Sequence, residues 1–171
     1  MKLIMSDRPL SLDGLDREEI HYVDLSALQI ANCVGCFGCW TKTPGRCVIR
    51  DDATKVYPLI AASEAVIYVS HILYGGYDTV MKTMLERAIP VQQAFIRVLE
   101  GETHHVQRAV VPKKAVIIAY GAPEEEEKAL FRQMVARNAH NMNFTQYDVL
   151  FCAEDAVEET VKAEVEKWAK L

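Results

Sequence analysis

Short apolar segments alternate with amphipathic segments along most of the chain. Continuous apolar runs at 64–70, 114–121 and 147–153 predict strands whose two faces are both buried. The run at 2–6 predicts a first strand, and the alternating residues at 20–25 predict a strand at the edge of a sheet. The pattern therefore predicts one sheet that is mostly covered on both sides.

Segments between and after these strands carry apolar residues at the spacing of a helix. They cover 53–63, 79–89, 124–142 and 156–171, and the third begins with acidic residues that suit the positive end of a helix dipole. Pro58 lies inside the first segment, so we expect a kink or an interruption there. Strands that alternate with helices predict right-handed βαβ units and a parallel sheet.

The alternation predicts a single α/β domain over residues 1–171. We expect a flavodoxin-like three-layer αβα sandwich with a five-stranded parallel sheet in the order 2-1-3-4-5. Only about a dozen residues separate the first two strands, which is the minimum for a parallel crossover, so the first helix is expected to be shortened or missing. That would leave one face of the sheet bare beside the first strand. Because exposed apolar patches favour association, we expect a homodimer or homotetramer.

Composition and charge narrow the classes of function. The formal net charge is −5, and the Lys and Arg residues are scattered among acids, which argues against nucleic-acid binding. No apolar run approaches the roughly 20 residues that a membrane-spanning helix needs. Acidic residues and proline occur too early for a signal peptide. We therefore expect a cytoplasmic protein with reduced thiols and with neither nucleic-acid nor membrane partners.

Four of the five cysteines lie in one short segment with the spacing C-x2-C-x2-C-x7-C. They are Cys33, Cys36, Cys39 and Cys47. Gly35 and Gly38 allow the backbone to bend toward a common centre. Thiolates grouped in this way are typical ligands of a metal ion or of a [4Fe–4S] cluster. Zinc binding, redox pairing and a reduced, metal-free loop are the alternatives. The remaining cysteine, Cys152, falls in a predicted strand and indicates a core position.

The segment from the thiols to residue 87 resembles the NAD(P)H-dependent FMN reductase and iron–sulfur flavoprotein group. Members show C-x-G-C-x-x-C, a G-x-C before a pair of acids, and a strand ending in a Ser-Pro-x-Tyr-Phe-Gly-like loop before a helix. The matching residues are Cys33, Gly35, Cys36, Cys39, Gly45, Cys47, Asp51, Asp52, Ser70, Tyr74, Gly75, Lys82 and Arg87. The resemblance implies a flavodoxin-like homo-oligomer that binds FMN, takes hydride from NAD(P)H and passes electrons to an unidentified acceptor. It also implies that the four cysteines can hold a [4Fe–4S] cluster.

The resemblance further implies which residues frame the flavin. Those that would border the isoalloxazine ring are Ser70, His71, Ile72, Leu73, Tyr74, Gly75, Gly76 and Tyr77. Their backbone N–H groups would reach the N5 and O4 edge, and Tyr74 or Tyr77 would offer an aromatic face. Gly121 and Ala122 would line the same pocket. The chain departs from the group at His71, where proline is usual, and at Leu73, where tyrosine is usual. The alternative is that the tyrosines pack at a subunit interface or at the end of the sheet.

The phosphate end of the expected flavin site is incomplete. Members of the group hold the FMN phosphate with a loop rich in hydroxyl groups and with the N-terminus of the first helix, an arrangement that suits anions. Here only Ser6, Arg8 and Ser11 are candidates, and Asp7 and Asp13 bring negative charge close to them. Asp16 adds a further acid. We therefore expect weak, altered or lost FMN binding.

Two functions follow from the sequence. The first is a flavodoxin-like NAD(P)H-dependent FMN oxidoreductase, with or without the cluster, in which the thiols and the Tyr74 bend meet at the same rim of the sheet. The alternative is a degenerate, non-catalytic module that binds metal, senses redox state or mediates interactions and has lost FMN.

The adjacent His104 and His105 point to opposite sides of any strand, so the pair is a poor bidentate ligand and is expected in a surface loop or hairpin.

Overall fold

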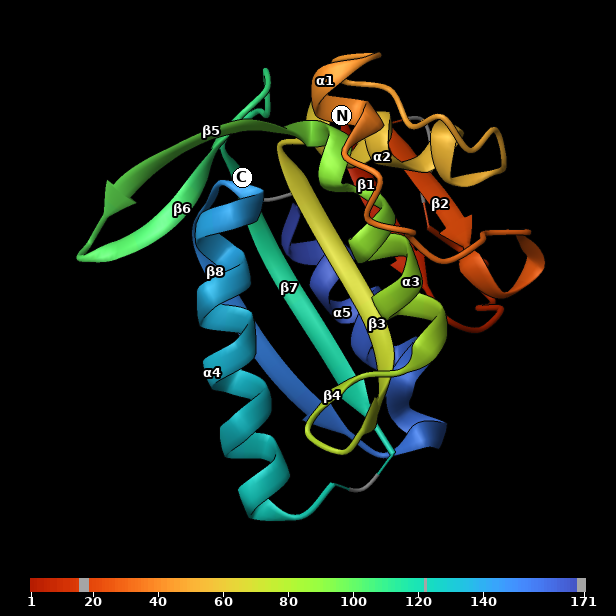
Figure 1. Cartoon of the computed structure of the whole chain (residues 1–171). Coiled ribbons are helices and arrows are strands. Elements are labelled where there is room, and N and C mark those ends of the chain that lie inside the picture. The colour runs from red at the N-terminus through yellow and green to blue at the C-terminus, as the bar shows by residue number, and fades with distance from the viewer. Residues whose placement is uncertain (16–18, 122, 169–171) are drawn as a thin grey trace.

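The computed structural model describes residues 1–15, 19–121 and 123–168. At its centre is a parallel sheet in the order β2-β1-β3-β7-β8 (Figure 1), and each neighbouring pair is parallel. The strands are β1 (Lys2–Ser6), β2 (Ile20–Asp24), β3 (Ala65–Leu73), β7 (Lys113–Tyr120) and β8 (Phe144–Cys152). The predicted strand order is confirmed, because β7 and β8 are the fourth and fifth strands of the main sheet.

Two hairpins are added to this sheet. β4 (Gly76–Tyr77) folds back antiparallel on the end of β3. β5 (Gln92–Leu99) and β6 (Glu102–Gln107) form a separate two-stranded ribbon that extends away from the main sheet (Figure 1). The hairpin predicted around His104 and His105 is therefore present.

One face of the sheet is covered by three helices. They are α2 (Ala53–Ala62), α3 (Thr79–Arg87) and α4 (Glu125–Met142). Buried residues from all three, such as Ile60, Met84 and Phe131, form one hydrophobic cluster with inward residues of the strands. The helix α2 runs through Pro58 without a break, so the expected interruption is wrong. Short helical turns complete the chain: α1 (Gly38–Thr41), η1 (Leu25–Ala27), η2 (Ile89–Val91) and η3 (Glu154–Ala156).

The opposite face is covered by one helix, α5 (Val157–Trp168), and by the segment after β1. The described residues between β1 and β2 contain no helix, as predicted. The expected bare face is nevertheless wrong, because Leu10 and Leu12 are buried against Ile4 and against residues of α5. A loop with two leucines thus takes the place of the first helix, and the argument for association from a bare face no longer holds. Within the described residues, no helix has the length and apolar character of a membrane span.

Candidate functional site

The thiols and the Tyr74 bend lie at opposite ends of the molecule. In Figure 1, α1, which belongs to the cysteine-rich segment, is at one end of the sheet and β4 is at the other. The helix α3 connects them, since Asp78 caps its first residue beside β4 and Arg87 in its last turn contacts Cys47. Nine residues of α-helix span roughly 13 Å. The expectation that both features share one rim is therefore wrong within a single chain.

We call residues 33–47 the thiol loop. A single apolar cavity is lined by all four of its cysteines, by aliphatic side chains and by Arg87; the aliphatic residues are Val34, Val48, Ile49 and Ile89. Gly35 has the positive φ of 63° that the predicted bend requires, and Phe37 has a φ of 54° immediately before α1. None of the cysteines forms a disulfide. The structure thus brings the predicted ligand set together around one space.

Arg87 anchors the thiol loop. Its side chain is 1% exposed, and its guanidinium binds both carboxylate oxygens of Asp51 at 2.6 and 2.8 Å. The same group donates to the carbonyl oxygens of Ala31 and Ile49, and it lies 3.4 Å from the Sγ atom of Cys47. A bidentate pair of this kind fixes geometry as well as charge. Arg87 and Asp51, which both match the pattern of the resembling group, therefore act together as an ion pair beside Cys47.

Burial and charge act on both the thiols and the neighbouring carboxylate. Burial raises the pKa of the Cys39 thiol, and the charge of neighbouring Cys47 raises it further. Partial burial acts to raise the pKa of Asp51, but the hydrogen bond from Arg87 prevails and lowers it. Asp51 is therefore ionised at neutral pH and pairs with Arg87. The guanidinium of Arg87 still lies within hydrogen-bond distance of the Cys47 Sγ atom.

The spacing of the thiols distinguishes between metal groups. Among the His, Cys, Asp and Glu residues that the structure describes, only Glu102, His104 and His140 form a group of three whose ligand atoms lie within 4.8 Å of one another. No three of the described thiols are therefore that close together. A single zinc ion would need sulfur atoms about 3.8 Å apart, given Zn–S bonds of about 2.3 Å. A cubane distributes its thiolates over separate iron atoms and therefore needs a wider ring of sulfurs. The thiols are therefore spaced more widely in this structure than a single tetrahedral zinc ion requires.

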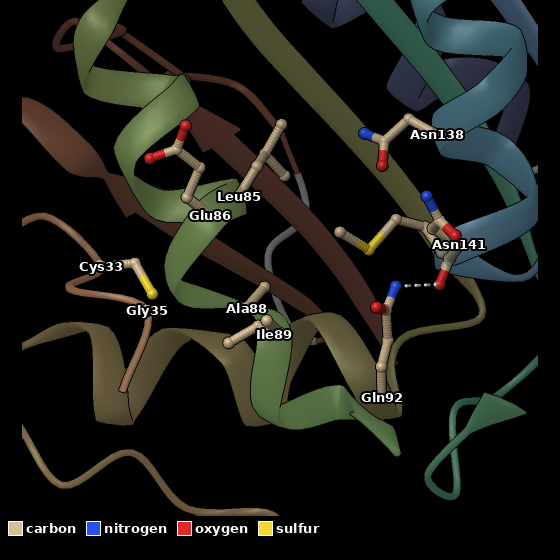
Figure 2. A pocket seen from close by; sticks show the side chains of 10 residues that line it. Cys33, Gly35, Leu85, Glu86, Ala88, Ile89, Gln92, Asn138 and Asn141 are labelled. Carbon is tan, nitrogen blue, oxygen red and sulfur yellow. Dashed lines mark hydrogen bonds between the residues drawn. The ribbon is translucent and has the colours of Figure 1, made fainter. Parts of the chain in front are cut away.

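A pocket of about 420 Å³ adjoins the thiol loop. Figure 2 shows Cys33 on one side of this pocket and Asn138 and Asn141 of α4 on the other. Gln92 forms part of the wall and donates a hydrogen bond to the backbone oxygen of Asn141. Three amide side chains offer both donors and acceptors, so the pocket suits a small polar molecule that would approach the thiol loop from the side of Cys33.

The residues predicted to border the flavin ring form a hairpin at the carboxyl ends of the strands. Ile72 pairs with Tyr77, and both side chains are buried in the core, where Tyr77 packs edge-on against Phe131. Tyr74, at the tip, is 86% exposed. Any contact of Ile72 or Tyr77 with a ligand would therefore be made by the backbone. Ser70, Leu73, Gly75 and Gly76 belong to the same hairpin, and the Ser70 hydroxyl donates to the carbonyl of His71.

A buried carboxylate occupies the rim between β1, β3 and β7. Asp7 accepts hydrogen bonds from the backbone N–H of His71 at 2.6 Å and from the hydroxyl of Tyr120 at 2.8 Å. Burial raises the pKa of Asp7. The imidazole of His71 lies edge-on to Tyr120 and so close to Gly121 that a Cβ there would be 2.3 Å from the ring. Gly121 is therefore required by packing, and Ala122 lies outside the described residues.

The candidate phosphate ligands already have anionic partners. Arg8 forms a 2.8 Å ion pair with Glu154, and the backbone N–H of Ser11 donates to Glu158 at 2.9 Å. The hydroxyl of Ser11 donates to Asp13, and the buried Ser6 hydroxyl accepts from the N–H of Arg8. Three carboxylates, of Glu154, Glu158 and Asp13, thus accept hydrogen bonds from Arg8 and Ser11. The donors predicted for an FMN phosphate are therefore already used within the chain.

Several residues of these two regions were not found from the sequence. Glu154, Glu158 and Tyr120 follow or end strands that are distant in sequence from β1, and no local motif marks them. Asn138 and Asn141 lie on the face of α4 that borders the pocket, within a pattern that was interpreted only as a helix. The carboxyl ends of parallel strands lie at the same edge of a sheet, and this rule could have predicted that Glu154 and Tyr120 lie close to the end of β1.

The fold is that of flavin-dependent reductases of the flavodoxin-like class. An FMN-dependent NADH-azoreductase from Bacillus anthracis matches with a TM-score of 0.61 and 11% identity, over 99% of this chain and 97% of that one. RosB, solved with a formylated riboflavin phosphate intermediate, matches with a TM-score of 0.60 and 9% identity, over 96% and 75%. Likeness at such identity shows the fold alone. No protein-family model matches the chain.

Two curated relatives are iron–sulfur flavoproteins. One, from Archaeoglobus fulgidus, is 35% identical over 83 residues, which are 48% of this chain and 36% of the relative. The other, from Methanocaldococcus jannaschii, is 26% identical over 77 residues, which are 45% of this chain and 39% of the relative. The predicted resemblance to this group is therefore confirmed. The match spans well under half of either relative's length.

Proposed function

We propose that the chain is a flavodoxin-like oxidoreductase whose redox centre is a [4Fe–4S] cluster held by Cys33, Cys36, Cys39 and Cys47. The observation that supports this most strongly is the convergence of the four thiols on one apolar cavity beside the buried cation of Arg87. When bound, such a cluster supplies one-electron transfer. The names of the curated relatives support the same assignment.

The chain's residues would control the environment of the cluster. Val34, Val48 and Ile49 would exclude water from one side, which changes the reduction potential of a cluster. Arg87 would offset part of the negative charge of the thiolates and hold Cys47 in place. The pocket beside Cys33 would receive a small polar electron donor or acceptor.

We further propose that FMN and NAD(P)H act at the opposite rim, by analogy with the flavin reductases that share the fold. The Tyr74 hairpin is the element that would border the ring. A second candidate is favoured by the ion pair of Arg8 with Glu154 and the hydrogen bond from Ser11 to Glu158, namely a protein that keeps the cluster and has lost FMN. In that case the thiol loop would serve electron transfer or redox sensing without flavin chemistry.

One preparation separates these functions. The protein is purified without oxygen, and iron, flavin and the visible spectrum are measured. We expect close to the four iron atoms of a cubane per chain, and loss of iron in Cys39→Ser but not in the matched variant Cys152→Ser. Iron-free protein with an unchanged fold would refute the cluster. FMN bound below micromolar concentration together with NAD(P)H oxidation would support the flavin enzyme, whereas iron without flavin binding would support the second candidate.

A further inference from the structure

A second group of metal-ligating side chains lies away from the thiols, between the β5–β6 hairpin and α4. Glu102 and His104 are two residues apart on β6, so their side chains lie on the same side of the strand. His140 is in the last turn of α4, which packs against β6. The ligand atoms of these residues all lie within 4.8 Å of one another.

His104 is oriented as a metal ligand. Its side chain is 7% exposed, and its two ring nitrogens lie 3.1 Å from oxygen atoms of Asn141 and Glu102. A neutral imidazole has one N–H and one lone pair. Donation of the Nδ1 proton to Asn141 leaves the Nε2 lone pair directed at the carboxylate of Glu102. A cation between these two atoms satisfies both, and an N–H donated to a neighbouring oxygen is the usual support of a ligating histidine.

The surrounding residues hold the other ligands in place. Arg137 donates to the Oε1 atom of Glu102 at 2.8 Å, which leaves Oε2 facing His104. Asn141 is itself fixed, because its backbone oxygen accepts from the side chains of Gln92 and Gln107. The carboxylate of Glu100, at the tip of the hairpin, is 3.6 Å from the Nε2 atom of His140. Glu100 or water can therefore fill a remaining coordination position.

We propose that Glu102, His104 and His140 bind a divalent transition-metal ion, with zinc as the best fit. Two imidazoles and a carboxylate are a common ligand set for zinc, and such ligands lie about 3.3 Å apart around a tetrahedral ion with bonds of 2.0–2.1 Å. The 3.1 Å between His104 and Glu102 already matches that separation. His104 pairs with His140 across the hairpin and helix, and not with its neighbour His105.

The proposed ion would clamp the hairpin to α4 and so support the thiol loop. On the opposite side of β6, the ring of His105 lies 4.6 Å from that of Trp40. Trp40 belongs to α1, within the thiol loop, and its indole N–H donates to Ile89. A metal bound on one side of β6 therefore fixes the strand whose other side contacts the thiol loop.

The test uses the histidines as reporters, so that it does not depend on the thiols or on a flavin. The full chain is treated with diethyl pyrocarbonate with and without added zinc, and modification of each histidine is followed by mass spectrometry. We expect zinc to slow modification of His140 about tenfold or more, as for a ligand whose lone pair is occupied. The exposed His21 on β2 is the internal control and is expected to react at the same rate in both samples.

Two variants make the test specific. Glu102→Gln keeps the shape of the side chain but removes its charge, and His140→Asn removes one imidazole at a partly exposed position. Zinc protection of His140 in Glu102→Gln is expected to need at least about tenfold more metal. Cobalt is expected to give visible d–d bands in wild-type protein that are weaker in His140→Asn, with thiolate-to-cobalt absorption unchanged. Equal modification of His140 with and without zinc, or undiminished protection in Glu102→Gln, would overturn the proposal.

Discussion

Ion pairs have different effects beside the thiol loop and at the carboxyl rim, which is the edge of the sheet where the parallel strands end. Beside the thiol loop, the buried Arg87 binds Asp51 and still has a donor 3.4 Å from the Sγ atom of Cys47. At the rim, Arg8 is bound to Glu154 and the N–H of Ser11 to Glu158, so the donors that a phosphate needs are occupied. In the first region the ion pair leaves a cationic group beside a thiol, whereas in the second the acidic side chains occupy the donors.

This difference shows how a fold can be retained while one of its sites changes. The strand order of this sheet does not depend on a helix after β1, because Leu10 and Leu12 cover the face that such a helix would otherwise protect. The scaffold and the phosphate site are therefore separable in energetic terms. The cysteine-rich segment, by contrast, contacts α3 through the buried side chain of Arg87.

The largest predicted effect concerns this buried charge. Arg87→Met leaves Asp51 without its partner and two backbone carbonyls without donors, and it should lower the free energy of unfolding by about 3–5 kcal/mol. Urea denaturation followed by circular dichroism measures the loss. Lys82→Met on the same helix is the matched control, because the exposed Lys82–Glu86 pair contributes about 0.5 kcal/mol or less. Similar losses in the two variants would remove the distinction between the two regions.

The second prediction asks whether the carboxyl rim can be opened. The double variant Glu154→Gln, Glu158→Gln removes two negative charges and frees Arg8 and the N–H of Ser11. One charge-assisted hydrogen bond contributes about 1.5–3 kcal/mol, so FMN should bind roughly ten- to a hundredfold more tightly. Quenching of flavin fluorescence measures the affinity. Glu159→Gln, an exposed change on the same helix, is expected to leave it unchanged, and an equal gain in that control would contradict the assignment.

The smallest predicted effect is the pH dependence that Asp7 gives to stability. Burial raises the pKa of Asp7 above its ordinary value of 3.8, so the folded state holds this proton more tightly than the unfolded state does. The resulting stabilisation is complete below about pH 4 and is lost as the pH rises through the raised value. Asp7→Asn should abolish this part of the decline, because an amide can still pair with His71 and Tyr120. Urea midpoints measured from pH 4 to 7 test this, and parallel profiles for the two proteins would count against it.

Much of the fold was predictable, because apolar runs and helical spacing depend on local sequence. The strand order follows from alternation and from the handedness of βαβ units. The uninterrupted α2 was not predicted, because packing of Val56, Tyr57 and Ile60 into the core outweighs the hydrogen bond lost at Pro58. The cover provided by Leu10 and Leu12 was also missed, since nothing in a short polar loop shows which of its residues are buried.

The candidate sites were predictable in composition but not in position. The spacing of the cysteines predicted that the four thiols would lie together, as they do around one cavity, but it could not show at which end of the sheet the loop would lie. That position is set by Arg87, which lies forty residues beyond Cys47 in the sequence. The placement of Glu102, His104 and His140 likewise depends on contacts between a hairpin and a helix. Contacts between segments that are far apart in the chain leave no periodic pattern of residues, so they cannot be predicted from the sequence in this way.

The central position of β1 in the sheet has a consequence for synthesis of the chain. Lys2 to Ser6 pair on one side with β2 and on the other with β3, whose first residue, Ala65, is opposite Lys2. At translation rates of about 5–20 residues per second, a ribosome needs several seconds before β3 exists. During that time a strand with the apolar residues Leu3, Ile4 and Met5 has one open edge. The nascent chain should therefore be a substrate for chaperones that bind short hydrophobic segments.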